Sequence, residues 1–255
     1  MKAQRPARKS EAAGRTRRPI IGTCPQLKGA KRMRTRVELA VSNADLLVGL
    51  VEAEGIAVAE SPPELRRLIE DLVARRASED FPPAERRAAI RKLLRTGGFD
   101  PSGRNKPASE YLAGRARAGE YPFHSNAVDI ANYISLLSGL PISLVDADLA
   151  LRGTASLLLR LGRQGESYVF NPVGQEIRLE GLLSLAREGD APVANPVKDS
   201  MESKVRPETR HLFGIVYGAR TTIDEESLAA HLEEFARLLR AHASAARTGT
   251  SILSG

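Results

Sequence analysis

The sequence predicts an α+β fold in which a mainly antiparallel sheet packs with helices. Helical and strand-like patterns interleave irregularly along the chain, without the repeated strand–helix–strand units that build a parallel sheet. Residues 142–197 consist of short apolar runs separated by Gly, Asn and Pro turns, a spacing that is typical of antiparallel strands.

Four helices are predicted in the first part of the chain. The first two begin at Ser61 and Pro82, where a Ser cap and prolines match the requirements of a helix N-terminus. The other two cover residues 108–117 and 126–138, and a glycine ends the last of them. Residues 46–51, which are apolar and partly β-branched, precede these helices as a buried strand.

The second half of the chain adds a late strand and a final helix. Residues 212–217 form an apolar run, as a buried strand requires. An amphipathic helix follows, with Phe235 and several leucines at helical spacing. Residues 246–255 are polar, and we expect them to form a flexible C-terminal tail.

Positive charge is concentrated at the N-terminus. Residues 1–36 contain twelve Lys or Arg and one acid, a net charge of +11, whereas the whole chain carries +7. The remaining residues are therefore net acidic, at −4. The basic segment has few apolar side chains and cannot bury enough surface to offset its chain entropy, so we expect a disordered tail. The expected globular domain covers residues 37–245.

Three interpretations of the basic tail remain open. As an arm that binds nucleic acid non-specifically, it would act by releasing counterions from phosphates. As a variable solvated extension, it would have no function of its own. As a mitochondrial transit peptide, it would be Arg-rich and poor in acids, although its amphipathic pattern is weak.

Composition and motifs narrow the function classes. The single cysteine, Cys24, excludes an intrachain disulfide framework, and a reducing, cytoplasmic location fits. No apolar run approaches the roughly 20 residues that span a bilayer, so we expect no membrane partner. The sequence has no nucleotide-binding glycine loop and no spacing typical of metal ligands, and we expect neither a metal nor another cofactor.

Three segments of the chain form an ordered set: Lys106-Pro107-Ala108-Ser109-Glu110-Tyr111-Leu112; then Asn126-Ala127-Val128-Asp129-Ile130-Ala131-Asn132-Tyr133-Ile134 with Gly139-Leu140-Pro141-Ile142 and Asp146 after it; then Asp199-Ser200, Lys204-Val205 and Glu208-Thr209. In order and spacing this set resembles the tRNA-editing module, B3/B4, of the phenylalanyl-tRNA synthetase β-subunit and its free-standing homologues. The resemblance extends over about residues 97–220. It implies a stand-alone B3/B4-like domain without the modules that charge tRNA.

The resemblance implies a function in the quality control of translation. In the synthetase the module hydrolyses mischarged tyrosyl-tRNA, as a second sieve for a product that a binding pocket does not reject. Ester hydrolysis needs a positioned water, polar groups that hold the substrate and donors near the developing oxyanion. The implied partner is the acceptor end of a tRNA, and the implied reaction is the hydrolysis of mischarged aminoacyl-tRNA.

The resemblance also implies a substrate pocket. Asn132 matches the family's asparagine, whereas Ala131, Ser143 and Ile215 stand where the synthetase has threonine, histidine and glutamate. We expect these residues to line one cavity between the helix over residues 126–138, the turn after it and the late strand. Asn132 and Ser143 would then act in catalysis, and the apolar replacements would favour an apolar aminoacyl group.

Further candidates come from the residue types themselves. His124 is a candidate to transfer protons in place of the missing histidine, because imidazole titrates near neutral pH. His211 directly follows a cation and is expected to face solvent. Four cations between the predicted strands are candidates to contact phosphates of the acceptor stem. They are Lys198, Lys204, Arg206 and Arg210.

Three functions remain in competition on the sequence alone. The first is a trans-acting aminoacyl-tRNA deacylase. The second is a non-catalytic tRNA- or RNA-binding module that keeps the fold and the groove for the acceptor end. The third is a binder of a free, amino-acid-like metabolite. The substitutions in the pocket favour the second and third, and the basic tail favours the first two.

Overall fold

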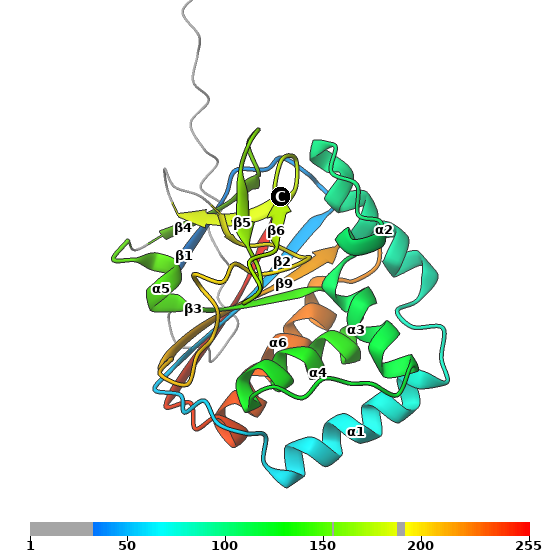
Figure 1. Ribbon diagram of the computed structural model, residues 1–255, viewed down its shortest axis with the longest axis vertical. Helices are drawn as coiled ribbons and strands as arrows, with labels where there is room; N and C mark the ends of the chain where they lie inside the picture. The colour runs from blue at the N-terminus through cyan, green and yellow to red at the C-terminus, as the bar shows by residue number, and fades with distance from the viewer. Residues whose placement is uncertain (1–32, 155, 188–191) are drawn as a thin grey trace, which may run out of the picture.

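The computed structural model describes residues 33–154, 156–187 and 192–255 (Figure 1). In this part of the chain, two four-stranded sheets pack face to face, and a layer of helices covers the other face of one of them. All strand pairs but one in these two sheets are antiparallel. The predicted α+β fold with a mainly antiparallel sheet is therefore confirmed.

The sheet beneath the helices, here called the central sheet, has the strand order β10-β2-β9-β3. Its longest strands, β2 (Leu46–Glu54) and β9 (His211–Ala219), pair along nine residues. Nearly every residue of both strands is buried, because one face of the sheet packs against the helices and the other against the second sheet. The outer strands are β3 (Ile142–Asp146) and β10 (Arg247–Ser254).

The second sheet has the order β1-β4-β7-β8, and its apolar side chains complete the core between the sheets. Its β1 strand (Arg36–Leu39) runs parallel to β4 (Ser156–Leu161). A separate hairpin projects beside it and covers one end of the sandwich (Figure 1). The remaining strands are β7 (Leu183–Arg187) and β8 (Pro192–Ala194), and the hairpin consists of β5 (Ser167–Val169) and β6 (Glu176–Arg178).

The helical layer follows the predicted apolar stripes. Leucines of the C-terminal helix pack so closely on the central sheet that a Cβ at Gly49 would lie 2.9 Å from Leu232. Larger side chains at this strand position would separate the helix from the sheet. The helices are α1 (Pro63–Ala77), α2 (Ala84–Leu94), α3 (Ala108–Arg117), α4 (Asn126–Ser138), α5 (Ala147–Leu151) and α6 (Glu225–His242), with short 3₁₀ turns η1 (Arg95–Gly97) and η2 (Gly103–Asn105).

Alternation along β3 and β9 points neighbouring side chains to opposite faces of the central sheet. Ser143 pairs with Ile215 across β3 and β9, and both side chains point toward the second sheet. Leu144 pairs with Gly214, and Leu144 packs with the helices. The odd-numbered residues of β3 and β9 are thus separated from α4 by the thickness of the sheet.

The expected boundaries of the domain were too narrow. Thr35 is buried, and its hydroxyl donates to Glu52 on β2 at 2.6 Å, so the fold begins before residue 37. At the other end, the expected flexible tail is the strand β10, which pairs with β2 from Arg247 to Ser254. Its β-branched residues, Thr248, Thr250 and Ile252, recur at every second position, a pattern that suits a half-buried edge strand. Residues 1–32 of the basic tail lie outside the described residues.

Removal of residues 247–255 should therefore destabilise the domain. The deletion exposes the edge of β2 and removes the buried side chain of Ile252 from the hydrophobic core. For a domain of this size, each kcal/mol lost lowers the thermal midpoint by about 2–4 °C. We expect a fall of several degrees in a thermal melt of the truncated chain. An unchanged midpoint would mean that β10 is not a stable part of the sheet.

Candidate functional site

Ser143 lies in a closed polar cluster between the two sheets. Its Oγ donates to the carbonyl of Asn195 at 3.0 Å and lies 3.2 Å from the hydroxyl of Tyr217. The side chains of Tyr168 and Asn195 hydrogen-bond each other, and the Tyr168 hydroxyl donates to the carbonyl of Lys198 at 2.5 Å. Ser143, Asn195 and Tyr217 are each at most 1% exposed. The hydroxyl of Ser143 is therefore shielded from solvent.

Asp199 is the ionisable residue of this cluster. Its Oδ2 accepts the N–H of Leu144 at 3.1 Å, whereas the buried Oδ1 makes no hydrogen bond within the described residues. Burial raises the pKa of Asp199 to about 6, and the nearby Ser143 hydroxyl and the backbone of Leu144 and Asn195 limit this rise. A carboxyl group with this pKa exchanges its proton close to neutral pH.

Asn132 and Ala131 lie on the opposite side of the central sheet from Ser143. Ala131 packs in the core formed by the helices, whereas Ile215 packs in the core between the sheets. Asn132 is half-buried beside Tyr121, in the loop before α4. The prediction that these four residues line one cavity is therefore wrong. Side chains alternate along β3, and this alternation points Ser143 away from α4, where Ala131 and Asn132 lie.

The residue of β9 whose side chain contacts the Ser143 hydroxyl is Tyr217, whereas the sequence predicted that Ile215 would line the pocket with Ser143. The two residues are on the same face of β9, two positions apart. Ile215 has no polar atom and is fully buried among apolar side chains. The strand period of two is the signal that could have identified Tyr217, since a shift of two residues keeps the same face.

His124 lies near Asp129 at the start of α4. Its side chain is exposed, and its backbone N–H donates to Asp129 Oδ1 at 2.9 Å. The other oxygen of Asp129 accepts from Ser61 Oγ at 2.6 Å, so Ser61 joins two helices instead of capping the first. The neighbourhood of His124 and Asp129 is on the helical side of the central sheet, away from Ser143.

The four cations proposed as RNA contacts have different environments. Lys198 lies with its Nζ 4.1 Å from the centre of the Phe170 ring, and the Lys204 Nζ donates to the Phe170 carbonyl at 2.7 Å. The guanidinium groups of Arg206 and Arg210 donate to backbone carbonyls within their own loop. Lys198 and Lys204 are thus brought together around Phe170, and Lys198 alone of the four lines one of the cavities described below.

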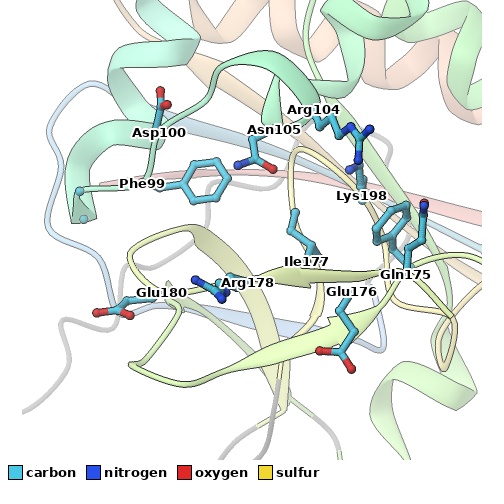
Figure 2. A pocket seen from close by; sticks show the side chains of 13 residues that line it. Phe99, Asp100, Arg104, Asn105, Gln175, Glu176, Ile177, Arg178, Glu180 and Lys198 are labelled. Carbon is cyan, nitrogen blue, oxygen red and sulfur yellow. The ribbon is translucent and has the colours of Figure 1, made fainter.

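An open cavity of about 770 Å³ lies between the η1–η2 segment and the β5–β6 hairpin (Figure 2). Figure 2 shows Phe99, Asn105 and Ile177 pointing into this space, with Arg104 and Lys198 at one end. We call this space the hairpin cavity. Its volume falls within the roughly 300–1,000 Å³ of small-ligand sites. Sequence reasoning missed Phe99 and Arg104, because they belong to an irregular segment without periodicity.

Positive and negative side chains lie at different places around the hairpin cavity. Two of the carboxylates at its rim accept from neighbouring hydroxyls: Asp100 from Ser102 at 2.6 Å, and Glu176 from Ser167 at 2.9 Å. Burial lowers the pKa of Lys198, and the charge of Arg104 lowers it further. The end of the cavity at Arg104 and Lys198 therefore favours an anion.

His211 was expected to face solvent, but its side chain is buried between two carboxylates. Its Nε2 lies 2.8 Å from Glu52 Oε1 and its Nδ1 3.2 Å from Asp148 Oδ1. Glu52 also accepts the N–H groups of Arg34 and Thr35. Position 211 begins β9, and the alternation of that strand turns its side chain inward. The cluster links the first described residues to the central sheet.

Neither a metal cluster nor a membrane-spanning helix is found in the described part of the chain. Across residues 33–154, 156–187 and 192–255, no three His, Cys, Asp or Glu side chains gather where they could hold a metal ion. No helix among these residues combines the length and apolar composition that a bilayer span requires.

The paired histidine should make stability depend on pH. Burial lowers the pKa of His211, but hydrogen bonds to Glu52 and Asp148 outweigh it and raise the pKa above 6.5. Protonated His211 therefore stabilises the fold fully below about pH 6.5, and this contribution is lost as the pH rises through the folded-state pKa. We expect the free energy of unfolding to decline above pH 6.5, and His211→Gln to remove that decline, as measured by urea titrations from pH 6 to 9.

His231 supplies a matched control. Burial and the charge of Arg86 lower the pKa of His231, so its stability contribution is lost as the pH falls and has the opposite sign. His231→Gln should leave the decline above pH 6.5 in place. If the decline persists in His211→Gln, the buried pair is not its source.

Comparison with known proteins assigns the fold to a family. The profile of the family described as "B3/4 domain" matches residues 101–243, more than half of the chain. The match begins before α3 and ends after α6, so it contains the polar cluster of Ser143 and part of the wall of the hairpin cavity. A search of curated proteins gave no match. The chain belongs to the B3/4 domain family, the domain found in the phenylalanyl-tRNA synthetase β-subunit.

Proposed function

We propose that this protein is an RNA-binding B3/4 protein that holds the acceptor end of a tRNA in the hairpin cavity. The observation that carries the proposal is a cation on an aromatic ring, with a second cation beside it, in that cavity. Lys198 and Arg104 lie close together, and Lys198 rests on the ring of Phe170. A nucleotide presents a phosphate to cations and a flat base to aromatic or apolar side chains.

The two cations favour a phosphate because they lack carboxylate partners. Neither Arg104 nor Lys198 forms an ion pair with any other described residue. Two like charges held together in a partly buried place repel each other, and the lowered pKa of Lys198 reflects this and its burial. A bound phosphate would relieve both effects and would make charge-assisted hydrogen bonds to each side chain.

The rest of the cavity suits a base or a ribose. Phe99 and Ile177 supply apolar surface, and Asn105 supplies a hydrogen-bond donor and acceptor. Terminal nucleotides of a tRNA are single-stranded, so their bases are free to enter such a cavity. The mixed lining is common to sites in which apolar contacts provide affinity and a few polar groups provide orientation.

Binding is favoured over hydrolysis because the proposed catalytic residues do not surround the cavity. Ser143 is enclosed between the sheets, Asn132 lies on the helical side, and His124 is exposed near α4. A positioned water requires groups that converge on one point within hydrogen-bond reach. We therefore rank the non-catalytic RNA-binding module above the deacylase, and binding of a free metabolite last, since the site's cations match a phosphate.

The deacylase remains a second candidate because of Asp199. This residue directly follows Lys198, and its carboxyl group has a pKa of about 6 and an oxygen without a hydrogen bond. If an opening of the β5–β6 hairpin admitted the substrate, Asp199 would accept a proton from water above pH 6. Hydrolysis of the aminoacyl ester would follow attack of that water on the carbonyl carbon, with the ribose hydroxyl as leaving group.

The binding proposal is tested with Arg104→Gln/Lys198→Gln. The double variant removes the two cations at one end of the cavity and should bind intact tRNA about tenfold more weakly, since charge-assisted hydrogen bonds to phosphate are lost. Fluorescence anisotropy with intact tRNA and with tRNA lacking its three terminal nucleotides would measure this. The wild type should prefer the intact tRNA, and the double variant should not.

Lys92→Gln serves as the control, because Lys92 is an exposed cation of α2 that does not line the hairpin cavity. Equal affinity of the wild type for intact and shortened tRNA would overturn the proposed site. Tighter binding of a free amino acid than of tRNA would support the metabolite alternative instead.

The deacylase candidate predicts a specific pH profile. A screen of mischarged tRNAs should show hydrolysis that rises with pH through about 6, because Asp199 acts as a base only when ionised. Asp199→Asn should abolish the reaction while leaving tRNA binding unchanged. Absence of hydrolysis with every charged tRNA, or an unaltered rate in Asp199→Asn, would exclude this mechanism.

A further inference from the structure

A second groove, between α2 and α3, carries an excess of positive charge. It has a volume of about 600 Å³ and is lined by residues of α2, of α3 and of the loops that precede them. One face of α2, at three- and four-residue spacing, forms one wall, and one face of α3 forms the other. We call it the α2–α3 groove. Its charged residues are Arg87, Arg91, Arg95, Lys106, Arg117, Asp80 and Glu110.

Two of the five cations are neutralised within the groove. Arg87 pairs with Asp80 at 2.7 Å. Arg91 donates twice to Glu110, at 2.8 and 2.5 Å, and so joins α2 to α3. These bidentate contacts fix the groove's walls and leave their donors largely occupied.

The other three cations have no carboxylate partner within the described ranges. Arg95 is exposed, and the Lys106 Nζ lies 5.8 Å from the centre of the Tyr111 ring. Arg117 donates to the carbonyl of Phe81 at 3.2 Å, and its charge helps to lower the pKa of Asp80 without forming an ion pair with it. The groove thus presents three available cations, although the chain after residue 36 is net acidic. General basicity of the domain does not explain them.

An exposed aromatic ring distinguishes this groove from a simple anion site. Tyr111 on α3 is 52% exposed and is the aromatic residue among the large exposed hydrophobic side chains of the described chain. It adjoins Lys106, which lines the groove. Cations that follow a backbone, with an aromatic ring beside them, are the features by which proteins bind single-stranded nucleic acid.

The groove and the hairpin cavity share a wall. Residues 97–100, 104 and 105 line the hairpin cavity, while Arg95 and Lys106, on either side of that stretch, line the α2–α3 groove. A linear ligand that extended out of one site would reach the other by crossing this short segment of the protein. A nucleic acid strand satisfies this geometry, because its phosphates recur at regular spacing, whereas a small anion would occupy one site only.

We propose that the α2–α3 groove binds the phosphodiester backbone of an RNA, with Arg95, Lys106 and Arg117 on phosphates and Tyr111 stacked on a base. The proposal rests on the proposed function only for the identity of the RNA. The groove lies partly outside the matched family region, since α2 ends before residue 101. Its contacts with phosphates are independent of sequence and of the aminoacyl group.

The test is charge reversal in the full-length protein. Arg95→Glu/Lys106→Glu should weaken binding of an RNA hairpin with a short single-stranded extension by at least tenfold. It should also reduce the slope of log affinity against log salt by about 1.4–1.8, since each lost phosphate contact removes about 0.7–0.9. Tyr111→Ala should weaken RNA binding and leave binding of inorganic polyphosphate unchanged.

Lys92→Glu is the matched control, because it reverses an exposed charge on the same helix outside the groove. Thermal melts of all variants would verify folding. Equal losses in Lys92→Glu and in the groove variant would overturn the proposal, as would equal losses of RNA and polyphosphate binding in Tyr111→Ala.

The same measurements separate the two proposals. If the wild type prefers tRNA with its terminal nucleotides but the groove variant binds like the wild type, the groove proposal fails and the proposed function stands. If the groove variant loses affinity for the hairpin while the wild type ignores the terminal nucleotides, the groove binds RNA and the hairpin cavity is not the acceptor site. Absence of any RNA binding by the wild type would overturn both.

Discussion

Burial of the central sheet on both faces is the constraint on which the rest of the structure depends. A strand with water on one side tolerates polar residues at every second position, but β2 and β9 have no such side. Each polar side chain on these strands must therefore find a partner inside the protein. Glu52 finds His211 and Thr35, and Tyr217 finds Ser143.

The same constraint decides where ligands can bind. Polar groups between the two sheets bond mainly to one another, and their exposure is close to zero. Groups available to a large ligand must instead lie at the margins of the sandwich. There, the irregular segment between α2 and α3 meets the β5–β6 hairpin on one side and the helices on the other. The family fold is thus retained, while its accessible chemistry lies outside the sheets.

Much of the fold could be predicted from the sequence because it depends on local periodicity. The apolar spacing in α6, the glycine that ends α4 and the apolar run of β9 each correspond to an element of the structure. β10 was not predicted, because its stability comes from pairing with β2, two hundred residues away in the chain. Local composition, dominated by Thr and Ser, carries little information on such a partner.

The candidate site was harder to predict, because it depends on which face of a strand a residue occupies. Ser143 and Asn132 are close in sequence, and the motifs that contain them led to the prediction that they line one cavity. A sheet lies between their side chains, and a one-residue change of position on a strand reverses the face. The residues around the hairpin cavity come from a 3₁₀ segment and a hairpin, whose contacts follow from tertiary packing alone.

The arginines and lysines differ in their partners according to whether they lie against the domain interior or at its margin. Two partly buried arginines donate to backbone carbonyls at the end of α4: Arg86 to Ser138, and Arg76 to Leu136 and Leu137. Such contacts satisfy orphan carbonyls at a helix C-terminus and occupy donors of these guanidinium groups. Arg95, Arg104 and Lys106 lie instead on one short segment that has two glycines with positive φ, Gly98 and Gly103.

No atom lies within 4 Å of a Cβ built at either glycine, so steric crowding does not require them. The backbone conformation does, because L-residues seldom adopt it. The turns at Gly98 and Gly103 let the chain leave α2, form a wall between groove and cavity, and enter α3. Cations on both sides of a wall this narrow repel one another unless anions lie between or beside them. A bound polyanion that neutralised both sides would stabilise the wall, and this would link the two proposed RNA contacts through one backbone segment.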